Sequence, residues 1–506
     1  MKQTHFEKLV LVSLVAAMLV ACGGGGGGTT PATPSVAAPI INITVSAAKA
    51  RVGESVTLSW TSTNATSCTG LDSTTAGVKA TSGTETIKPT AGGQYTYTIS
   101  CDGAGGTVKQ SVGLVVPIPV STSSYKNWKE IGMTATVFPA ESYRDIAGIP
   151  GPFAYGWADF FQTGKRELFT AHDRYTDAIK DTSIPRSQLY TTIHNDPRYH
   201  SDLTIWHLND DGTWTKRWEQ KGCVKPRKAL IADFNGDRIP DIFLACHDIN
   251  SEDGIPTYGE YSYIVLSDGK GGFNASPVAG TLGYNHGGSA ADFNKDGYPD
   301  LYLSGTHLLL NNKDGTFTSV DHGISRSIFP DWEGEYFSVE AMDVDGDGNF
   351  DLLCGGDEGA TFNPPGTPRV TNPFQIETAI FYGDGTGHFD TFTKLPGVAK
   401  RALVEDFTMV TNNGVKSLYI GRTSSYDSGL IGPQCFNGSY CTNTLQVVNL
   451  VTLASTVILD LVTPPNTWSD KTNWSHWWIP TTQNGVNGVG TFETVSGDNF
   501  IHFITQ

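Results

Sequence analysis

One motif recurs five times beyond residue 125, and this recurrence constrains the fold more than any other feature of the chain. Each copy is a short apolar run that ends in an aspartate, and these anchors are Asp159, Asp233, Asp292, Asp343 and Asp406. A loop and a second short strand follow each anchor. The anchors lie roughly 50 to 75 residues apart, which is the length of a four-stranded propeller blade. The sequence therefore predicts an all-β fold built around a β-propeller.

A second motif, a tight Asp/Gly turn, recurs once between each pair of successive anchor aspartates. Tight Asp/Gly turns flanked by strands begin at Asp210, Asp268, Lys313 and Asp384, as expected between the third and fourth strands of a blade. Three more strands are predicted near the C-terminus, over residues 474–480, 489–494 and 499–504. A strand near residues 133–138 could join them and close the ring. We count six blades, or seven if the region before Phe153 contains another.

Three of the anchored loops have the pattern of a cation site. Side-chain oxygens alternate over nine residues that begin with the anchor and end in a second aspartate, as a hard cation with several oxygen ligands requires. The predicted metal-binding positions are Asp233, Asn235, Asp237, Ile239 and Asp241; Asp292, Asn294, Asp296, Tyr298 and Asp300; and Asp343, Asp345, Asp347, Asn349 and Asp351. The pattern predicts calcium (Ca2+) at about three sites.

The details of these loops exclude an EF-hand, because they join strands and lack the closing glutamate. Arg238 stands where the other two loops have glycine. The loops after Asp159 and Asp406 do not repeat the alternating carboxylates, and we interpret both as lost sites.

The repeats over roughly residues 153–423 resemble the FG-GAP and VCBS repeats of integrin-α-type propellers. This resemblance implies calcium at the three intact loops only. It also implies adhesion or glycan binding, although a shared fold does not by itself specify a function.

The N-terminus has the pattern of an export signal. Lys2 and Lys8 precede an apolar run that is too short to span a bilayer. The run ends in Leu-Val-Ala-Cys at residues 19–22, which resembles a bacterial lipobox and implies acylation of Cys22. Gly23 matches the outer-membrane sorting pattern. We therefore expect a signal peptide over residues 1–22 and an exported, lipid-anchored protein at the outer membrane or cell surface, facing either the periplasm or the exterior.

Residues 23–40 are rich in Gly, Thr and Pro and are predicted to form a tether. Residues 41–117 alternate short strands with turns, which predicts a small β-sandwich. The segments 53–60 and 64–68 resemble a bacterial immunoglobulin-like module, whose expected role is a spacer, with glycan binding as the alternative. After a second linker, the propeller is predicted over residues 125–506.

Cysteine usage fits an oxidising compartment. Cys68 and Cys101 are predicted to bond across the sandwich, and Cys435 and Cys441 to form a local bridge. Whether Cys223 pairs with Cys246 stays open. Cys354 is then left as a buried thiol.

Charge restricts the partners. The chain has 51 Asp and Glu residues against 34 Lys and Arg, a net charge of −17. This balance excludes nucleic acid and anionic membrane surfaces as partners, so the predicted lipid is the expected membrane contact. The partner should be a glycan or a surface protein.

Cations and histidines collect where a ligand could bind. In a propeller the first strand of each blade lines the channel, so its start and the end of the second strand share one face, opposite the acidic loops. The predicted ligand-binding residues on that face are His172, Arg227, His247, His286, His307, Arg401 and Arg422. They suit an anionic ligand such as a uronate-bearing glycan, although such groups can also serve only to pair with neighbouring carboxylates.

Three classes of function remain open at this point. The first is a glycan-binding or protein-binding module for adhesion or capture. The second is a carbohydrate-active enzyme, a polysaccharide lyase or hydrolase that would use the histidines as bases. The third is an assembly factor in an envelope complex. Common motifs for a serine nucleophile, a P-loop, haem attachment or a zinc helix are absent from the sequence.

Overall fold

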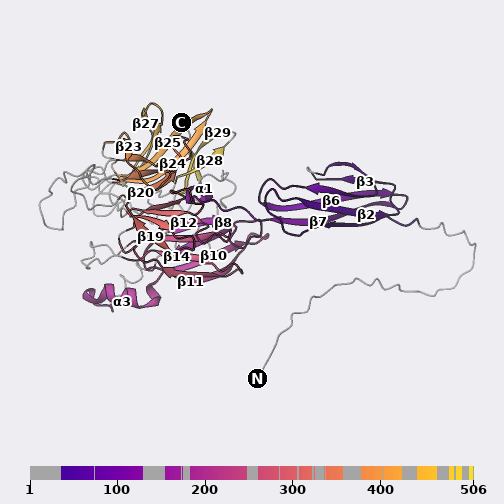
Figure 1. The fold of residues 1–506 in the computed structure, drawn as a ribbon, viewed down its shortest axis with the longest axis horizontal. Helices are drawn as coiled ribbons and strands as arrows, with labels where there is room; N and C mark the ends of the chain where they lie inside the picture. The colour runs from indigo at the N-terminus through magenta and orange to yellow at the C-terminus, as the bar shows by residue number, and fades with distance from the viewer. Residues whose placement is uncertain are drawn as a thin grey trace, which may run out of the picture. The chain divides into compact units, whose positions relative to one another are not determined.

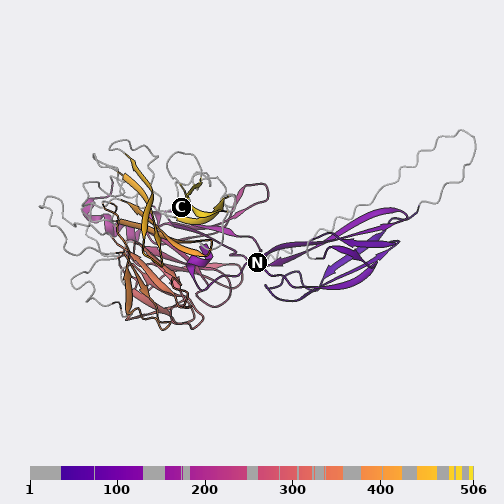
Figure 2. The same ribbon diagram turned by 90° about the horizontal axis from the view of Figure 1, so that it is seen from above.

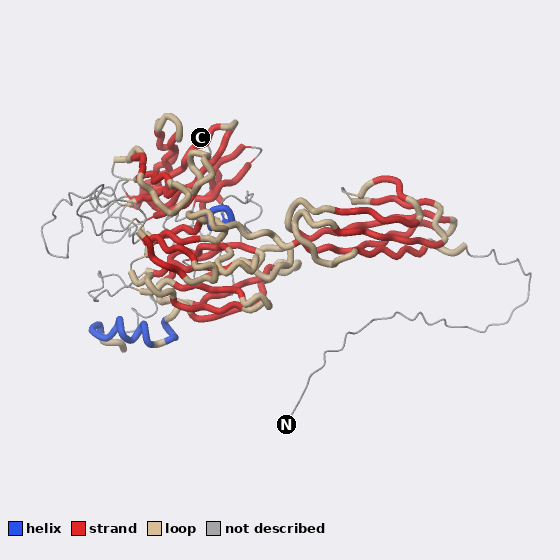
Figure 3. The backbone as a smooth tube through the Cα atoms, in the orientation of Figure 1, coloured by secondary structure: helices blue, strands red, loops and turns tan. Residues whose placement is uncertain are grey.

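The computed structural model describes residues 36–128 and 154–504 apart from residues 73–74, 173, 175–182, 248–259, 284, 305–306, 322–323, 325–335, 337, 357–377, 400, 402, 424–440, 464–477, 484–485 and 493–500. Cys22, the Cys435–Cys441 pair and the strand predicted near residues 133–138 therefore fall wholly or partly outside the described residues. Strands dominate the described chain (Figure 3). Within it, no helix is long and apolar enough to cross a membrane.

The first seven strands form two sheets. One has the order β1 (Ile40–Val45), β2 (Val56–Thr63), β5 (Ser82–Ile87), and the other β4 (Gly77–Lys79), β3 (Ser67–Gly70), β6 (Gly93–Gly103), β7 (Gly106–Val116). Burial alternates along β2, where Val56, Leu58 and Trp60 are buried, as expected for a sheet with one face on a core.

The structure contains the disulfide between Cys68 and Cys101, with an S–S distance of 2.02 Å. These residues lie directly opposite each other on β3 and β6 of the same sheet. The expectation that the bond crosses between two sheets was therefore wrong, because the paired strands are neighbours. The bond joins adjacent strands of one sheet.

The remaining strands form six further sheets (Figures 1 and 2). In chain order they are β8 (Ala154–Ala158), β9 (Glu167–His172), β10 (Asp202–Leu208) and β11 (Trp214–Lys221); β12 (Pro226–Ala232), β13 (Asp241–Cys246), β14 (Tyr263–Ser267) and β15 (Phe273–Pro277); β16 (Gly288–Ala291), β17 (Asp300–Leu303), β18 (His307–Asn311) and β19 (Phe317–Val320); β20 (Ser338–Met342), β21 (Asp351–Gly355), β22 (Ala379–Tyr382) and β23 (Thr391–Lys394); β24 (Leu403–Asn412), β25 (Val415–Thr423), β26 (Cys441–Asn449) and β27 (Ser455–Thr463); and β28 (Trp478–Gln483), β29 (Val486–Phe492) and β30 (Ile501–Ile504).

Each sheet is antiparallel, and its strands follow one another in chain order. The first strands of successive sheets contact one another, from β8 to β12, β16, β20, β24 and β28. The first strand β8 is buried along its whole length, whereas the fourth strand β11 is mostly exposed. This gradient from inner to outer strand is consistent with propeller blades.

A short helix, α1 (Ser124–Trp128), lies among these inner strands and contacts β8, β12, β16 and β20 (Figure 1). The Ser124 hydroxyl oxygen accepts a hydrogen bond from the Ala290 N–H at 3.0 Å. Tyr125 is buried, and its hydroxyl oxygen accepts from the Met409 N–H on β24 at 2.9 Å. Ser124, expected to be the last residue of the linker, is thus buried together with Tyr125 at the start of the predicted propeller.

Helices also occur in an insertion between β9 and β10, namely η1 (Arg186–Gln188), α3 (Leu189–Asn195) and η2 (Pro197–Tyr199). Leu189 and Ile193 of α3 pack with Val224, just before β12. This apolar contact fixes the insertion beside the start of the second sheet.

Candidate functional site

Four of the five anchored loops share one backbone conformation. Counting the anchor aspartate as position one, position four has a positive φ of 52° at Gln162, 79° at Gly236, 58° at Lys295 and 86° at Gly346. Position six repeats this, with 75° at Gly164, 69° at Arg238, 92° at Gly297 and 85° at Gly348. Arg238 therefore adopts the left-handed conformation that glycine adopts in the other three loops.

The anchor aspartate closes each loop by accepting backbone N–H groups. The Asp343 carboxylate accepts from the Gly346 N–H at 2.7 Å and from the Gly348 N–H at 3.2 Å. Asp233 likewise accepts from positions four and six, and Asp292 accepts from positions five and six. Within the loop, the position-five carboxylate accepts from the N–H of position seven, as Asp347 does from Asn349 at 2.7 Å. These bonds hold the carboxylates of one loop together.

The ninth position ties each loop to the rest of its sheet. Asp241, Asp300 and Asp351 are fully buried. Each accepts the N–H of position two of its own loop and a second N–H just after or at the end of the third strand, from Ser267 at 2.7 Å, Asn311 at 2.9 Å and Gly383 at 3.0 Å. The buried aspartates thus connect the loop to the hairpin of strands three and four.

Burial makes these carboxylates hard to ionise without a neighbouring positive charge. Desolvation raises the pKa of Asp300 to about 7 and that of Asp351 to about 6, and it raises the pKa of Asp241 well above its usual range. Other aspartates of the same loops, such as Asp296 and Asp345, add to the rise. A bound cation would offset both effects.

The third loop has the densest set of carboxylates. Asp343, Asp345 and Asp351 each place one oxygen within 4.8 Å of the others. In the first two loops, the position of Asp345 is taken by Asn235 and Asn294, whose carbonyl oxygens each accept the position-five N–H at 3.0 Å. All three loops offer oxygen donors, which calcium prefers, and the third carries the most negative charge.

The other two anchors differ from each other. After Asp406 the nine-residue loop is absent, because β24 and β25 continue to a turn near Asn413. After Asp159 the loop is kept, and its ninth residue is Glu167. Glu167 was not predicted as a member of the set, although its spacing of eight residues from Asp159 equals that of the intact loops.

The predicted ligand-binding residues of the second and third sheets lie at the end opposite the acidic loops. In the second sheet Ala232 pairs with Asp241 at the loop end, and Pro226 pairs with Cys246 at the other end. His247 follows directly, and its N–H donates to the Lys225 carbonyl oxygen at 2.9 Å. His286 precedes β16, and the rings of His247 and His286 meet edge to face with centroids 4.0 Å apart. We call this end of the sheets the mouth.

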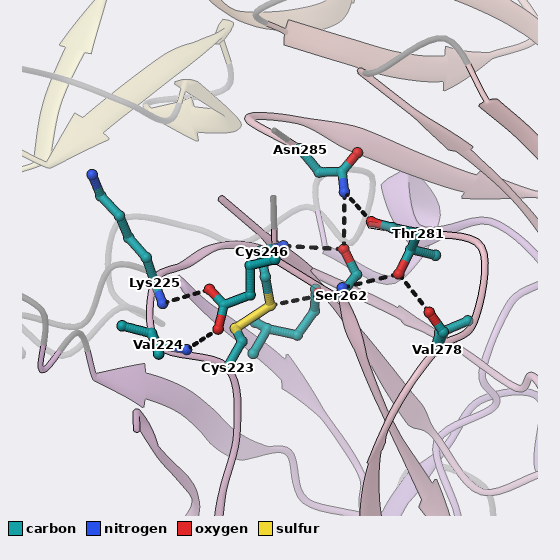
Figure 4. Close-up of a disulfide and its surroundings, with 10 residues drawn as sticks. Cys223, Val224, Lys225, Cys246, Ser262, Val278, Thr281 and Asn285 are labelled. Atoms are coloured by element: carbon teal, nitrogen blue, oxygen red, sulfur yellow. Dashed lines mark hydrogen bonds between the residues drawn. A yellow bond between two sulfur atoms is a disulfide. The ribbon is translucent and has the colours of Figure 1, made fainter. Parts of the chain in front are cut away.

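A disulfide and a polar network fix this part of the mouth (Figure 4). Cys223 bonds to Cys246 with an S–S distance of 2.09 Å. The buried Glu260 carboxylate accepts the N–H groups of Val224 at 2.5 Å and Lys225 at 3.1 Å. Glu260 was not predicted as part of the site, because nothing in its local sequence distinguishes it.

The residue before His286 is held by the same network. The Asn285 side-chain amide donates to the Ser262 hydroxyl oxygen at 3.3 Å and to the Thr281 carbonyl oxygen at 2.9 Å. The Ser262 hydroxyl also accepts the Cys246 N–H at 3.2 Å. The disulfide and these hydrogen bonds therefore hold the residues that precede His247 and His286 in place.

The predicted arginines of the fifth sheet already have protein partners. The Arg401 guanidinium donates to the Asp460 carboxylate at 2.9 Å. Arg422 is buried and donates to the Gln446 side-chain oxygen at 2.7 Å and to the Thr378 hydroxyl at 3.1 Å. It also donates to the Arg401 carbonyl oxygen at 3.4 Å, which places the two residues side by side.

The remaining predicted ligand-binding residues have the following positions. His172 is buried at the end of β9, where it pairs with Asp202. Arg227 is half-buried on β12. His307 begins β18, and its side chain is not among the described ones. The structure thus brings together His247 with His286 and Arg401 with Arg422.

Comparison with known proteins gives one family match and distant structural likenesses. No curated protein matches the sequence. Among solved structures, an auxiliary nutrient binding protein from Bacteroides thetaiotaomicron covers 91% of this chain and 96% of its own, at 8% identity and a TM-score of 0.38. A candidate 6-phosphogluconolactonase from Bacteroides fragilis covers 82% of this chain and 92% of its own, at 11% identity and a TM-score of 0.33.

The family match concerns the second and third sheets. Residues 233–303 match the model of the FG-GAP-like repeat. The matched segment includes the acidic loops that begin at Asp233 and Asp292. The chain therefore contains an FG-GAP-like repeat in a propeller-like, all-β fold.

Proposed function

We propose that this protein binds an extracellular ligand, a glycan or a protein surface, at the mouth, and that calcium in the three acidic loops stabilises the blades. The observation that carries the proposal is the contact between His247 and His286. The two imidazole rings contact each other next to the Cys223–Cys246 disulfide, at the end of the sheets opposite the acidic loops. Recognition sites are commonly built from a few polar groups held in this way.

Charge supports an anionic ligand. The Lys225 carbonyl oxygen accepts the His247 N–H, and Arg227 lies two residues further on at the start of β12, whereas the molecule as a whole has a net charge of −17. A local cluster of cations and histidines on an acidic protein favours carboxylate-bearing ligands such as uronate glycans. Arg401 and Arg422 add less, because their guanidinium groups are engaged within the fifth sheet.

Two disulfides support an oxidising compartment and hence export. The proposed anchor is the acyl group on Cys22. A Cys22→Ser protein should be released from the membrane fraction, and a variant that still partitions with membranes and matures normally would refute the anchor.

The binding proposal is tested by equilibrium binding to an array of acidic and neutral polysaccharides. His286→Ala should weaken binding to the acidic members about tenfold or more, since His286 is only partly buried and its loss should leave the fold intact. His247→Ala and Arg227→Ala should act in the same direction. His388→Ala is the matched control, because His388 is exposed in the Asp/Gly turn at the end of the fourth sheet where the acidic loop lies.

The results separate the candidate functions. If all three mouth variants bind like the parent, the ligand does not bind at the mouth. If the parent releases shortened or unsaturated sugar products, the enzyme hypothesis replaces the binding one.

A further inference from the structure

The loop from Asp159 to Glu167 in the first sheet keeps the backbone of a cation loop but changes its side chains. Positions four and six have the same positive φ as in the three acidic loops. The Asp159 carboxylate accepts the N–H groups of Thr163 at 2.6 Å and Gly164 at 2.9 Å, which are positions five and six, the same two that Asp292 accepts. The conformation therefore forms here with a different set of side chains.

The altered positions remove oxygen ligands. Position three is Phe161, whose ring packs on that of Phe273 with centroids 5.8 Å apart. The Arg217 guanidinium lies over the Phe161 ring, 4.5 Å from its centroid. Position five is Thr163, which has one hydroxyl in place of a carboxylate. Calcium takes six to eight oxygen ligands at short range, and this loop has lost the carboxylate or amide oxygens at two positions.

Two carboxylates remain, and both are buried. Asp159 and Glu167 are 1% and 0% exposed. The Thr163 hydroxyl lies between them, 3.5 Å from an Asp159 oxygen and 3.3 Å from a Glu167 oxygen. On the other side, His207 Nδ1 lies 3.3 Å from the same Glu167 oxygen. Two buried negative charges this close are costly unless one is neutralised.

Protein cations neutralise this pair only in part. The Lys165 ammonium is paired with Asp210 at 2.6 Å, and the Arg217 guanidinium lies over Phe161. Arg166 also lies close enough to Asp159 to interact with its charge.

We propose that this loop binds a proton in place of a cation, and that the proton is held on Glu167, which accepts a hydrogen bond from the Thr163 hydroxyl and donates one to His207 Nδ1 beside Asp159. The first sheet then responds to pH, whereas the second, third and fourth respond to calcium. Burial, and after it the charge of Asp159, raises the pKa of Glu167 from its ordinary 4.5 to about 7. Burial, Arg217 and Lys165 lower the pKa of His207, so His207 is a neutral acceptor in this range.

The direction of the effect follows from linkage. Because the pKa of Glu167 is raised by folding, the folded state binds the proton more tightly than the unfolded state. The stabilisation is complete below about pH 4.5 and is lost as the pH rises to about 7. Over that range the contribution of Glu167 to the unfolding equilibrium constant should change by up to about 300-fold.

The test is the melting temperature of the full chain between pH 5 and 8, for the parent and for Glu167→Gln, each in excess calcium and in chelator. Glutamine resembles the protonated glutamate, so the variant should melt several degrees above the parent at pH 8 and close to it at pH 5. The difference should be the same with and without calcium. Glu219→Gln, in an exposed ion pair with Lys216 on β11, is the control and should follow the parent.

Two outcomes would overturn the proposal. One is a parallel pH dependence of parent and Glu167→Gln. The other is a difference that appears only with calcium, which would make the loop a fourth cation site. If Glu167→Gln does not fold, Asp159→Asn serves instead, because removal of the neighbouring charge should move the pH-dependent loss of stability to lower pH; an unchanged midpoint contradicts the proposal.

Discussion

At the residue scale, a buried ion pair joins the inner strands of three sheets. The Lys228 ammonium on β12 donates to the Glu340 carboxylate on β20 at 2.7 Å, and the two side chains are 4% and 1% exposed. The Ser289 hydroxyl on β16 donates to the second carboxylate oxygen at 3.4 Å. Lys228 directly follows Arg227 on β12, and successive residues of a strand point to opposite faces of its sheet.

We expect Glu340→Gln to lower the free energy of unfolding by about 3–5 kcal/mol, because it leaves the Lys228 charge buried without its partner. Replacing Lys228 by Met and Glu340 by Leu together should cost less than the single change. Lys216→Gln is the matched control, since it breaks an exposed pair worth about 1 kcal/mol or less. Urea denaturation measures all four chains. If Glu340→Gln lowers the free energy of unfolding no more than Lys216→Gln does, the buried pair contributes little to stability.

At the element scale, the sequence predicted most of the strands and loops but not the helices. The anchors at Asp159, Asp233, Asp292 and Asp343 each begin a nine-residue loop, and the strands that precede and follow these loops lie where the spacing predicts. α1 was missed because five residues are too few to show a helical period. Glu260 was missed because its partners, the N–H groups of Val224 and Lys225, are distant in sequence. The partners of Arg422 were missed for the same reason.

The three acidic loops should differ in calcium affinity. The third has a carboxylate at Asp345 where the other two have amides, so we expect Asp345→Asn to weaken one site of three about tenfold. Chelation should lower the melting temperature of the parent, because calcium binds the folded loops alone. Asp384→Asn, in an exposed turn, is the control. Calorimetric titration of the chelated protein would contradict this prediction if Asp345→Asn and the parent gave the same isotherm.

At the scale of the whole molecule, the segment that enters the propeller-like sheets is part of their core. Tyr125 packs with Met342, Leu353 and Phe407, and its hydroxyl oxygen accepts a hydrogen bond from the Met409 N–H. α1 therefore links the inner strands of several sheets.

Tyr125→Ala in the full chain should lower the free energy of unfolding by about 3–5 kcal/mol, because it opens a cavity and removes the hydrogen-bond acceptor of the Met409 N–H. Tyr125→Phe should cost only about 1–3 kcal/mol, the value of the lost hydrogen bond. Thermal melting compares the two. Equal melting temperatures for Tyr125→Ala and the parent would mean that α1 is not needed to hold the sheets together.

Four loops share one backbone conformation, and we propose that three of them bind calcium and the fourth binds a proton. The most direct test is the calcium content of the full chain after it has been stripped with chelator and dialysed to equilibrium at pH 7 with micromolar to millimolar calcium. We predict that binding saturates at three ions per chain. Saturation at four would place a cation at Glu167, and no bound calcium at millimolar concentration would contradict the account as a whole.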